Sequence, residues 1–222
     1  MGSKSAGKRP RKGNLVIAVD GPAASGKGTI ARALAAHFGL PHMDTGLLYR
    51  AVALNLWRWG GDPSSEFEAT RACDELNLDS SDPELRSEPV SKIASAVSAY
   101  PAVRSALLER QQVFARQPDG AVLDGRDIGT VIAPDADAKL FITATPEVRA
   151  ERRLKELEGR GMHAHFADVL ADIRARDERD SSRTEAPLKP AADALLLDTS
   201  ALSVEEAIAA ALRLVEEQLA RA

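Results

Sequence analysis

The sequence of 222 residues contains a single cysteine and few aromatic residues, which make up 4% of the chain. Cys73 has no second cysteine to pair with, so an intrachain disulfide is excluded and we expect a reducing, cytoplasmic location. No apolar run reaches the roughly 20 residues of a membrane span, and no signal-peptide pattern opens the chain. We therefore expect no membrane association.

An excess of positive charge is also missing, because the formal net charge is -4 at pH 7. This balance argues against bulk electrostatic binding to nucleic acid. Only residues 1–14 are basic without any acid, and we interpret them as a flexible tail outside the fold. A nucleic-acid-binding module that uses this tail is an alternative, which tail truncation would test.

Histidine is scarce too, with four residues in the chain. They form no pattern typical of a catalytic triad. His163 and His165 supply two ligands at most, which is too few for a structural metal centre. We therefore expect no metal site built from protein side chains alone.

Short apolar runs alternate with helical patterns along the chain, which predicts an α/β fold. The predicted strands form a five-stranded parallel sheet with helices on both faces. Ligands of such sheets bind beyond the carboxyl ends of the strands. The strands are expected at residues 15–20, 40–43, 121–124, 139–143 and 194–198. The helices are expected at residues 27–38, 46–59, 65–77, 88–99, 101–116, 146–158 and 166–180, with a last one after a capping box of Ser203 and Glu206.

The motif GPAASGKGT at residues 21–29 lies between the first predicted strand and the first predicted helix. Its glycines let backbone N–H groups surround a phosphate at a helix N-terminus, and Lys27 can reach the β- and γ-phosphates. The motif predicts a P-loop NTP-binding fold, and we expect ATP as the phosphate donor. The strict pattern has Ser or Thr directly after the lysine, and Gly28 stands there, so we expect Mg²⁺ to be held mainly by nucleotide phosphates and water. The expected ATP-binding residues are Gly21, Ala23, Ala24, Ser25, Gly26, Lys27, Gly28 and Thr29.

Arginines gather at the same predicted edge of the sheet. Arg50 lies near the start of the second helix, and the motif DGRD at residues 124–127 follows the third strand. Arg176, Asp180 and Arg183 share one helix face by their spacing. A P-loop needs a phosphate acceptor, and arginine forks bind phosphate oxygens. The other interpretation is an exposed helix face covered with ion pairs.

Two helical patterns that meet at GRG, residues 159–161, carry further arginines, among them Arg153. They are typical of a lid that excludes water from the reacting phosphates, although an ordinary helical hairpin has the same pattern. A nucleoside monophosphate is already an anionic nucleophile at pH 7, so positioning and charge neutralisation suffice for its phosphorylation.

Taken together, the motifs GKGT at residues 26–29, DTG with YR at 44–50, DGRDIGT at 124–130 and RDERD at 176–180 resemble the bacterial cytidylate kinase family. The resemblance runs from about residue 15 to the last helix. It implies a monomeric enzyme that transfers the γ-phosphate of ATP to CMP or dCMP. It also implies one kinase domain over residues 15–222, with a core (15–60, 101–150 and 184–222), a small helical acceptor-binding insert (about 61–100) and a lid (about 151–183).

The resemblance also implies residue roles. Arg50, Arg126 and Arg183 would hold the acceptor phosphate, Arg176 and Asp180 the sugar, and Ser95, Arg104 and Asp127 the cytosine edge. Thr45, Tyr49 and Asp124 complete the expected acceptor site. The expected catalytic residues are Lys27, Arg126, Arg153 and Arg183.

Two features depart from the family pattern. Thr45 stands where a serine is usual, and residues 77–85 are too few for the small antiparallel sheet that many relatives carry. A P-loop kinase for AMP, dTMP or UMP stays open as an alternative. A GTP-binding switch is disfavoured, because the sequence has no Asn-Lys-x-Asp motif.

Overall fold

The computed structural model describes residues 15–76 and 78–221, so the predicted tail at residues 1–14 lies outside the described part. A five-stranded sheet occupies its centre, with the strand order β2-β3-β1-β4-β5. All four strand pairings are parallel, as the alternating pattern predicts. The strands are β1 (Val16–Asp20), β2 (His42–Asp44), β3 (Ala121–Gly125), β4 (Ala138–Thr143) and β5 (Leu195–Asp198).

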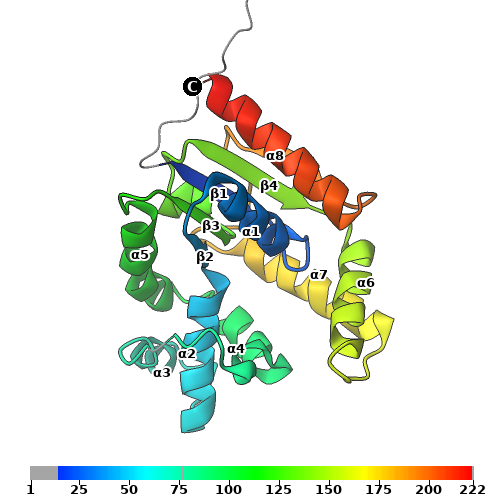
Figure 1. Ribbon diagram of the computed structural model, residues 1–222. Coiled ribbons are helices and arrows are strands. Elements are labelled where there is room, and N and C mark those ends of the chain that lie inside the picture. Colours follow the sequence, from blue (N-terminus) through cyan, green and yellow to red (C-terminus); the bar gives the residue numbers. More distant parts are fainter. Residues whose placement is uncertain (1–14, 77, 222) are drawn as a thin grey trace, which may run out of the picture.

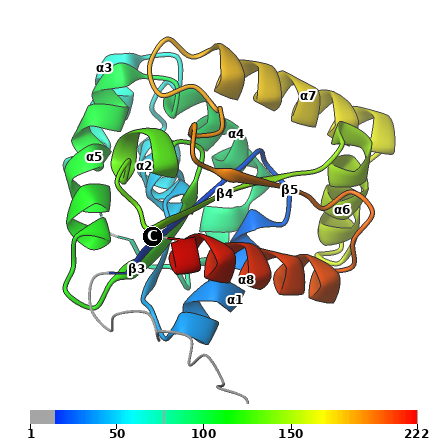
Figure 2. The ribbon, with the colours of Figure 1, turned by 90° about the horizontal axis from the view of Figure 1, so that it is seen from above.

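Helices cover both faces of the sheet (Figures 1 and 2). On one face α1 (Lys27–Phe38) and α8 (Val204–Arg221) pack on β1 and β4, with Leu34, Leu140 and Val215 in their shared core. On the other face α5 (Pro101–Ala115) and a π-helical turn, η2 (Ile128–Ile132), pack on β3. The predicted α/β class is confirmed. The capping box of α8 forms as expected, because the backbone N–H of Ser203 donates to Glu206 Oε2 at 2.8 Å and that of Glu206 to Ser203 Oγ at 3.2 Å.

A helical layer lies below the β2 side of the sheet in Figure 1. It contains α2 (Gly46–Trp59), α3 (Glu66–Arg71), the 3-10 helix η1 (Pro83–Arg86) and α4 (Glu88–Val97). Its apolar core joins Val52 and Leu56 to Ala69, Val97 and Leu107. Between positions 76 and 86, the described residues contain no strand, in line with the short segment found there.

The helix predicted over residues 65–77 is too long, since α3 ends at Arg71. The side chain of Asn55 donates to the carbonyl oxygens of Ala72 at 3.2 Å and Glu75 at 3.3 Å. These bonds hold residues 72–75 in turns after the end of α3. A local helical pattern cannot predict them, because Asn55 lies on another helix. The other helix and strand ends differ from the prediction by two residues or fewer, the ordinary uncertainty of element ends.

A helical hairpin stands at the β5 side, at the right of Figure 1. It consists of α6 (Pro146–Glu158) and α7 (Phe166–Ser182), which enclose a small core of Ala150, Leu157, Val169 and Ile173. Within the described residues, no helix combines the length and apolarity needed to cross a membrane.

Candidate active site

The loop after β1 has the geometry of an anion cradle. Gly21 has φ 152°, and a β-carbon there would lie 2.1 Å from the carbonyl oxygen of Ile142, so only glycine fits. The loop enters α1 through Gly26, which has φ 90° and offers no side-chain cap. The first N–H groups of α1 therefore stay available for a ligand that carries negative charge.

Lys27 begins α1 beside this cradle. Burial lowers the pKa of Lys27 to about 8, and the positive charge of Arg126 acts in the same direction. The carboxylates of Asp124 and Asp44 oppose this shift but do not cancel it. The site thus holds a cation whose charge a bound phosphate would stabilise.

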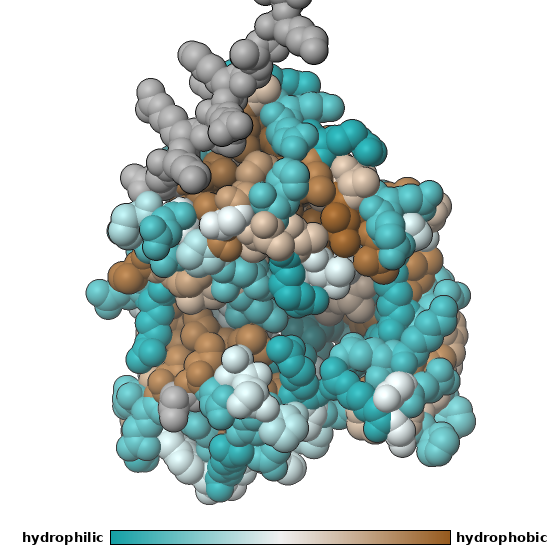
Figure 3. All heavy atoms as spheres, in the orientation of Figure 1, coloured by the Kyte–Doolittle hydropathy of each residue, from teal (hydrophilic) through white to brown (hydrophobic). Residues whose placement is uncertain are grey.

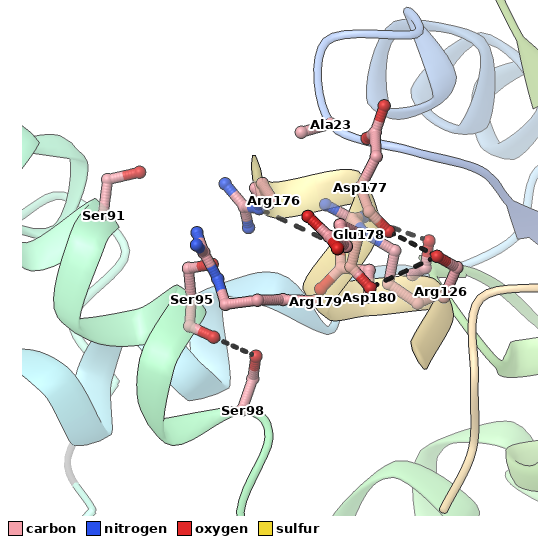
Figure 4. A network of polar contacts seen from close by, with 12 residues as sticks. Ala23, Ser91, Ser95, Ser98, Arg126, Arg176, Asp177, Glu178, Arg179 and Asp180 are labelled. Carbon is pink, nitrogen blue, oxygen red and sulfur yellow. Dashed lines mark hydrogen bonds and ion pairs between the residues drawn. The ribbon is translucent and has the colours of Figure 1, made fainter. Parts of the chain in front are cut away.

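Asp180 of α7 is the centre of an arginine cluster. Its side chain is 2% exposed and accepts hydrogen bonds from Arg126 Nε at 2.9 Å and from Arg183 Nη2, while Arg176 Nε lies 3.9 Å away. Burial raises the pKa of Asp180, but the three arginines outweigh it and the net shift is downward. Figure 4 shows Arg126 joined to Asp180, with Arg176 beside them.

One carboxylate cannot balance these three guanidinium groups. Burial and the neighbouring Arg126 lower the pKa of Arg176. The Nε atoms of Arg176 and Arg183 are buried and have no hydrogen-bond partner among the described residues. Because buried donors are nearly always satisfied, the cluster has the charge and the free donors of a site for an anion.

The structure brings most of the predicted acceptor residues to one cleft between the helical layer and the hairpin. Figure 3 shows the surface hollowed in this region, with hydrophilic residues around it. The predicted residues that line the cleft are Thr45, Tyr49, Arg50, Arg104, Arg126, Asp127, Arg176, Asp180 and Arg183.

Arg104 is held at one end of this cleft from three sides. It forms an ion pair with Asp127, donates to the carbonyl oxygen of Ser98 at 3.3 Å, and lies 5.7 Å from the centre of the Tyr49 ring. Its side chain is only 10% exposed. The guanidinium group is therefore fixed in place and directed into the cleft instead of ending in solvent.

Three predicted residues lie outside this lining, and Arg50, within it, is bonded to other partners. Ser95 is buried, and its hydroxyl accepts a hydrogen bond from Arg179 at 3.2 Å. Arg50 lines the cleft but donates to Leu85 O at 2.9 Å and Ser91 Oγ at 3.1 Å. Arg153 pairs with Glu88 and, at 2.6 Å, with Glu156. Asp124 lies at the end of β3, where its Oδ1 is 2.7 Å from His42 Nε2.

Comparisons with known proteins identify the family of this chain. The family profile described as "Cytidylate kinase" matches residues 17–217. The chain belongs to the cytidylate kinase family. A cytidylate kinase of Xanthobacter autotrophicus is 60% identical over 209 residues, which are 93% of this chain and 99% of the relative. One from Methylocella silvestris is 59% identical over 203 residues, covering 91% of this chain and 94% of the relative. Among solved structures, an unliganded sugar kinase of Janibacter sp. HTCC2649 aligns over 94% of this chain and 98% of its own, with 21% identity and a TM-score of 0.48.

In this member of the cytidylate kinase family, the sequence-based site omits several side chains that hold the predicted ones. Ser98 lines the cleft and accepts from Arg183 Nη2 at 2.8 Å, and it follows Ser95 by one helical turn (Figure 4). The spacing of Ser95 and Ser98 on one helix face is a signal that could have found it. His42 has no such signal, because a histidine on a three-residue strand has many explanations.

Proposed function

We propose that this member of the cytidylate kinase family transfers the γ-phosphate of ATP to CMP or dCMP, giving ADP and CDP or dCDP. The observation that carries the proposal is the meeting of two anion sites. Arg126 and Arg176 of the acceptor cleft lie close enough to Lys27 of the P-loop for their charges to lower its pKa. A donor phosphate at Lys27 and an acceptor phosphate at these arginines would therefore be neighbours, as phosphoryl transfer requires.

The donor half would be the loop at residues 21–29. We propose that Gly21, Ala23, Ala24, Ser25, Gly26, Gly28 and Thr29 would surround the ATP phosphates together with Lys27, mainly through backbone N–H groups, although that of Thr29 donates to the carbonyl oxygen of Gly26 at 3.1 Å. Nucleotide phosphates and water would hold most of the Mg²⁺ coordination, and Asp124 is the carboxylate that would contribute an oxygen ligand. The Asp124 Oδ2 lies 3.6 Å from where a β-carbon of residue 28 would stand, beside the helix start.

Phosphates and water would supply the other ligands of Mg²⁺. No cluster of three or more His, Cys, Asp or Glu residues able to hold a metal occurs in the part of the chain that the structure describes. When bound, the ion would neutralise charge on the transferred phosphoryl group.

The acceptor half would use the cleft. We propose that Arg50, Arg126 and Arg183 bind the CMP phosphate, and that Arg176 and Asp180 position the sugar. At the other end, Arg104 would donate to the O2 and N3 acceptors of cytosine, while Asp127 and Ser95 would accept from its amino group. Ser98 adds a second hydroxyl at this end.

We propose that α3, η1 and α4 of the helical layer are the acceptor-binding insert (about 61–100) and that the hairpin is the lid (about 151–183). The enzyme would be a single-domain monomer. Ser91 and Ser95 of α4 accept from Arg50 and Arg179, so the insert borders the cleft opposite the hairpin. Lys27, Arg126, Arg153 and Arg183 would neutralise charge during transfer. Closing of the hairpin over the cleft would exclude water.

An assay of ADP release with ATP, Mg²⁺ and one acceptor at a time tests this proposal. CMP and dCMP are the expected best acceptors among CMP, dCMP, UMP, AMP and dTMP. The Lys27→Ala variant serves as the inactive control, with kcat lower by about a hundredfold or more. If AMP or dTMP gives the highest kcat/KM, the acceptor assignment is wrong.

A further inference from the structure

Two arginines of α6 contact carbonyl oxygens of the P-loop. Arg149 Nη1 donates to the carbonyl oxygen of Ala23 at 3.3 Å, and Arg152 Nη1 donates to that of Ser25 at 3.2 Å. The hairpin is therefore bonded to the backbone of the loop that receives the donor phosphates. Arg149 lies on the helical pattern that predicts the lid, but the sequence assigns it no role of its own.

Arg149 is itself held by α7. Its side chain is 3% exposed. The guanidinium group forms a bidentate salt bridge with Asp177, in which Nη1 donates to Oδ1 at 2.9 Å and Nη2 donates to Oδ2. Its Nε donates to the carbonyl oxygen of Ala144, at the end of β4, at 2.9 Å. A fork–fork pair of this kind fixes both the position and the plane of the guanidinium group.

The contact with Ala23 has a consequence for the next peptide group. In a trans peptide the C=O and the following N–H point in opposite directions. When the Ala23 carbonyl faces Arg149, the N–H of Ala24 faces away from Arg149. Ala24 also has φ 57°, a left-handed conformation that a residue other than glycine adopts only when its surroundings favour it. The opposite peptide orientation would direct a partially negative oxygen toward bound phosphate.

We propose that Asp177 is a positioning residue for donor binding: it fixes Arg149, which holds the Ala23 carbonyl away from the ATP phosphates. The inference rests on the proposed function only in placing ATP at the P-loop. Asp177 has no contact with the acceptor cleft in this arrangement, since it lies on the lining of a separate cavity. Its loss should therefore weaken ATP binding and spare CMP binding.

The pair of Arg149 and Asp177 lies at the wall of the separate cavity. The cavity has a volume of about 420 Å³ and is bordered by Pro22, Arg149, Asp177 and Leu188. Arg149 is only 3% exposed, so its position depends on its hydrogen bonds. Without the carboxylate of Asp177, Arg149 would keep the carbonyl oxygens of Ala144 and Ala23 as acceptors, but Nη2 would lose the oxygen to which it donates. The plane of the guanidinium group would then no longer be fixed.

The chain offers a matched control at the same helix junction. Arg174, one turn before Asp177 on α7, pairs with Glu147 of α6 at 2.8 Å. This pair joins the same two helices but lies at the surface, with side chains 60% and 49% exposed. Arg174→Gln removes an α6–α7 ion pair without touching the P-loop contact.

The experiment measures the Kd of ATP and the Kd of CMP by calorimetry, the kinetic constants and the melting temperature for Asp177→Asn and Arg174→Gln. We expect Asp177→Asn to weaken ATP binding about tenfold and to raise KM for ATP more than it lowers kcat, with the Kd of CMP changed less than about twofold. Arg174→Gln should leave both Kd values at the wild-type level. Because Asp177 acts through Arg149, adding Asp177→Asn to Arg149→Met should weaken ATP binding no further.

Three results would overturn the inference: an unchanged Kd for ATP in Asp177→Asn, equal losses for ATP and CMP, or the same loss in Arg174→Gln. If Asp177→Asn does not fold, Arg149→Lys provides the same test, because lysine keeps the positive charge but cannot form the bidentate pair with Asp177. A wild-type enzyme that binds ATP but does not phosphorylate CMP would refute the proposed function and leave this inference standing.

Discussion

Arg126 and Asp180 are 54 positions apart in the sequence, and yet Arg126 Nε donates to Asp180 Oδ2 at 2.9 Å. Arg126 follows β3, whereas Asp180 lies near the end of α7, so this bond ties the hairpin to the ligand edge of the sheet. Asp180 also accepts from Arg183. The carboxylate is thus the point at which the hairpin and the sheet meet the proposed acceptor phosphate and sugar.

Replacing Asp180 by alanine should change the choice of sugar. A hydrogen bond from a ribose hydroxyl to a carboxylate is worth about 1.5–3 kcal/mol, and dCMP lacks the 2′-hydroxyl. We therefore expect Asp180→Ala to lower kcat/KM for CMP more than for dCMP, measured side by side. A purely structural ion pair predicts a lower melting temperature with equal losses for both acceptors, so an unchanged CMP-to-dCMP ratio would assign Asp180 to stability alone.

Replacing Arg104 by methionine should impair recognition of the base. Methionine keeps the length and the apolar contact of the side chain but donates no hydrogen bond. A site that pairs with polar base atoms discriminates between bases through those hydrogen bonds. Without the Arg104 donor, KM for CMP should rise about tenfold or more, and the preference for CMP over UMP should shrink. The Kd of ATP should change less than about twofold.

The matched control for Arg104 is Arg110→Met on the exposed side of the same helix, α5. Arg110→Met should leave KM for CMP, the preference for CMP over UMP and the Kd of ATP unchanged. Loss of the buried pair with Asp127 should also lower the melting temperature of Arg104→Met, because an unpartnered carboxylate remains behind. Normal CMP kinetics in a folded Arg104→Met enzyme would place the base-reading site elsewhere.

The lowered pKa of Lys27 should make ATP binding depend on pH. Its free-enzyme pKa is about 8, and bound phosphate favours the charged form, so the pKa in the complex must be higher. Affinity for ATP should be constant with respect to this group below about pH 8 and fall as pH rises above it, by up to about tenfold per pH unit. Calorimetric Kd values between pH 7 and pH 9.5 measure this slope.

Lys27→Arg is the control for that pH dependence. The guanidinium group stays charged throughout the range, so the fall above pH 8 should disappear even if the affinity itself is lower. A slope that persists unchanged in Lys27→Arg would mean that another group titrates.

The parts of the fold that sequence predicts best are those determined by neighbours in the chain. The helices α1 and α2 have the predicted ends, because each stops at a glycine, Gly39 or Gly60, in the left-handed conformation. The face shared by Arg176, Asp180 and Arg183 follows from helical spacing in the same way. Local chemistry is enough for such features.

Features that depend on distant partners could not be predicted. The end of α3 is set by Asn55, on another helix, and the hydroxyl of Ser95 binds Arg179, which is 84 positions away. The same holds for Arg149, whose partners lie in α7 and in the P-loop. A sequence shows that these residues are polar or charged, but the tertiary fold decides what each one contacts.

The last prediction concerns Arg153, a proposed catalytic residue that is bound to the insert in this structure. Its Nη2 forms an ion pair with Glu88, at the start of α4, 65 positions away. A guanidinium group paired in this way must leave Glu88 before it can neutralise a transferring phosphoryl group. Glu88 thus competes with the substrate phosphates for Arg153.

Glu88→Gln should weaken this competition and raise kcat/KM. The pair is partly exposed, with side chains 18% and 34% accessible, and such pairs contribute up to about 1 kcal/mol, so we expect a gain of about two- to fivefold. The gain should shrink at high ionic strength, which screens the pair in the wild-type enzyme. Glu84→Gln, which removes the exposed pair between Glu84 of the same insert and Arg58 of α2, should give no gain.

A double-variant cycle decides whether the gain passes through Arg153. In the Arg153→Ala background, Glu88→Gln should have no effect on kcat/KM, because the residue that it releases is gone. Arg153→Ala alone should lower kcat, as loss of a preorganised charge does. If Glu88→Gln instead lowers kcat/KM, or raises it equally in both backgrounds, the contact between Glu88 and Arg153 organises the closed enzyme and does not compete with the substrate.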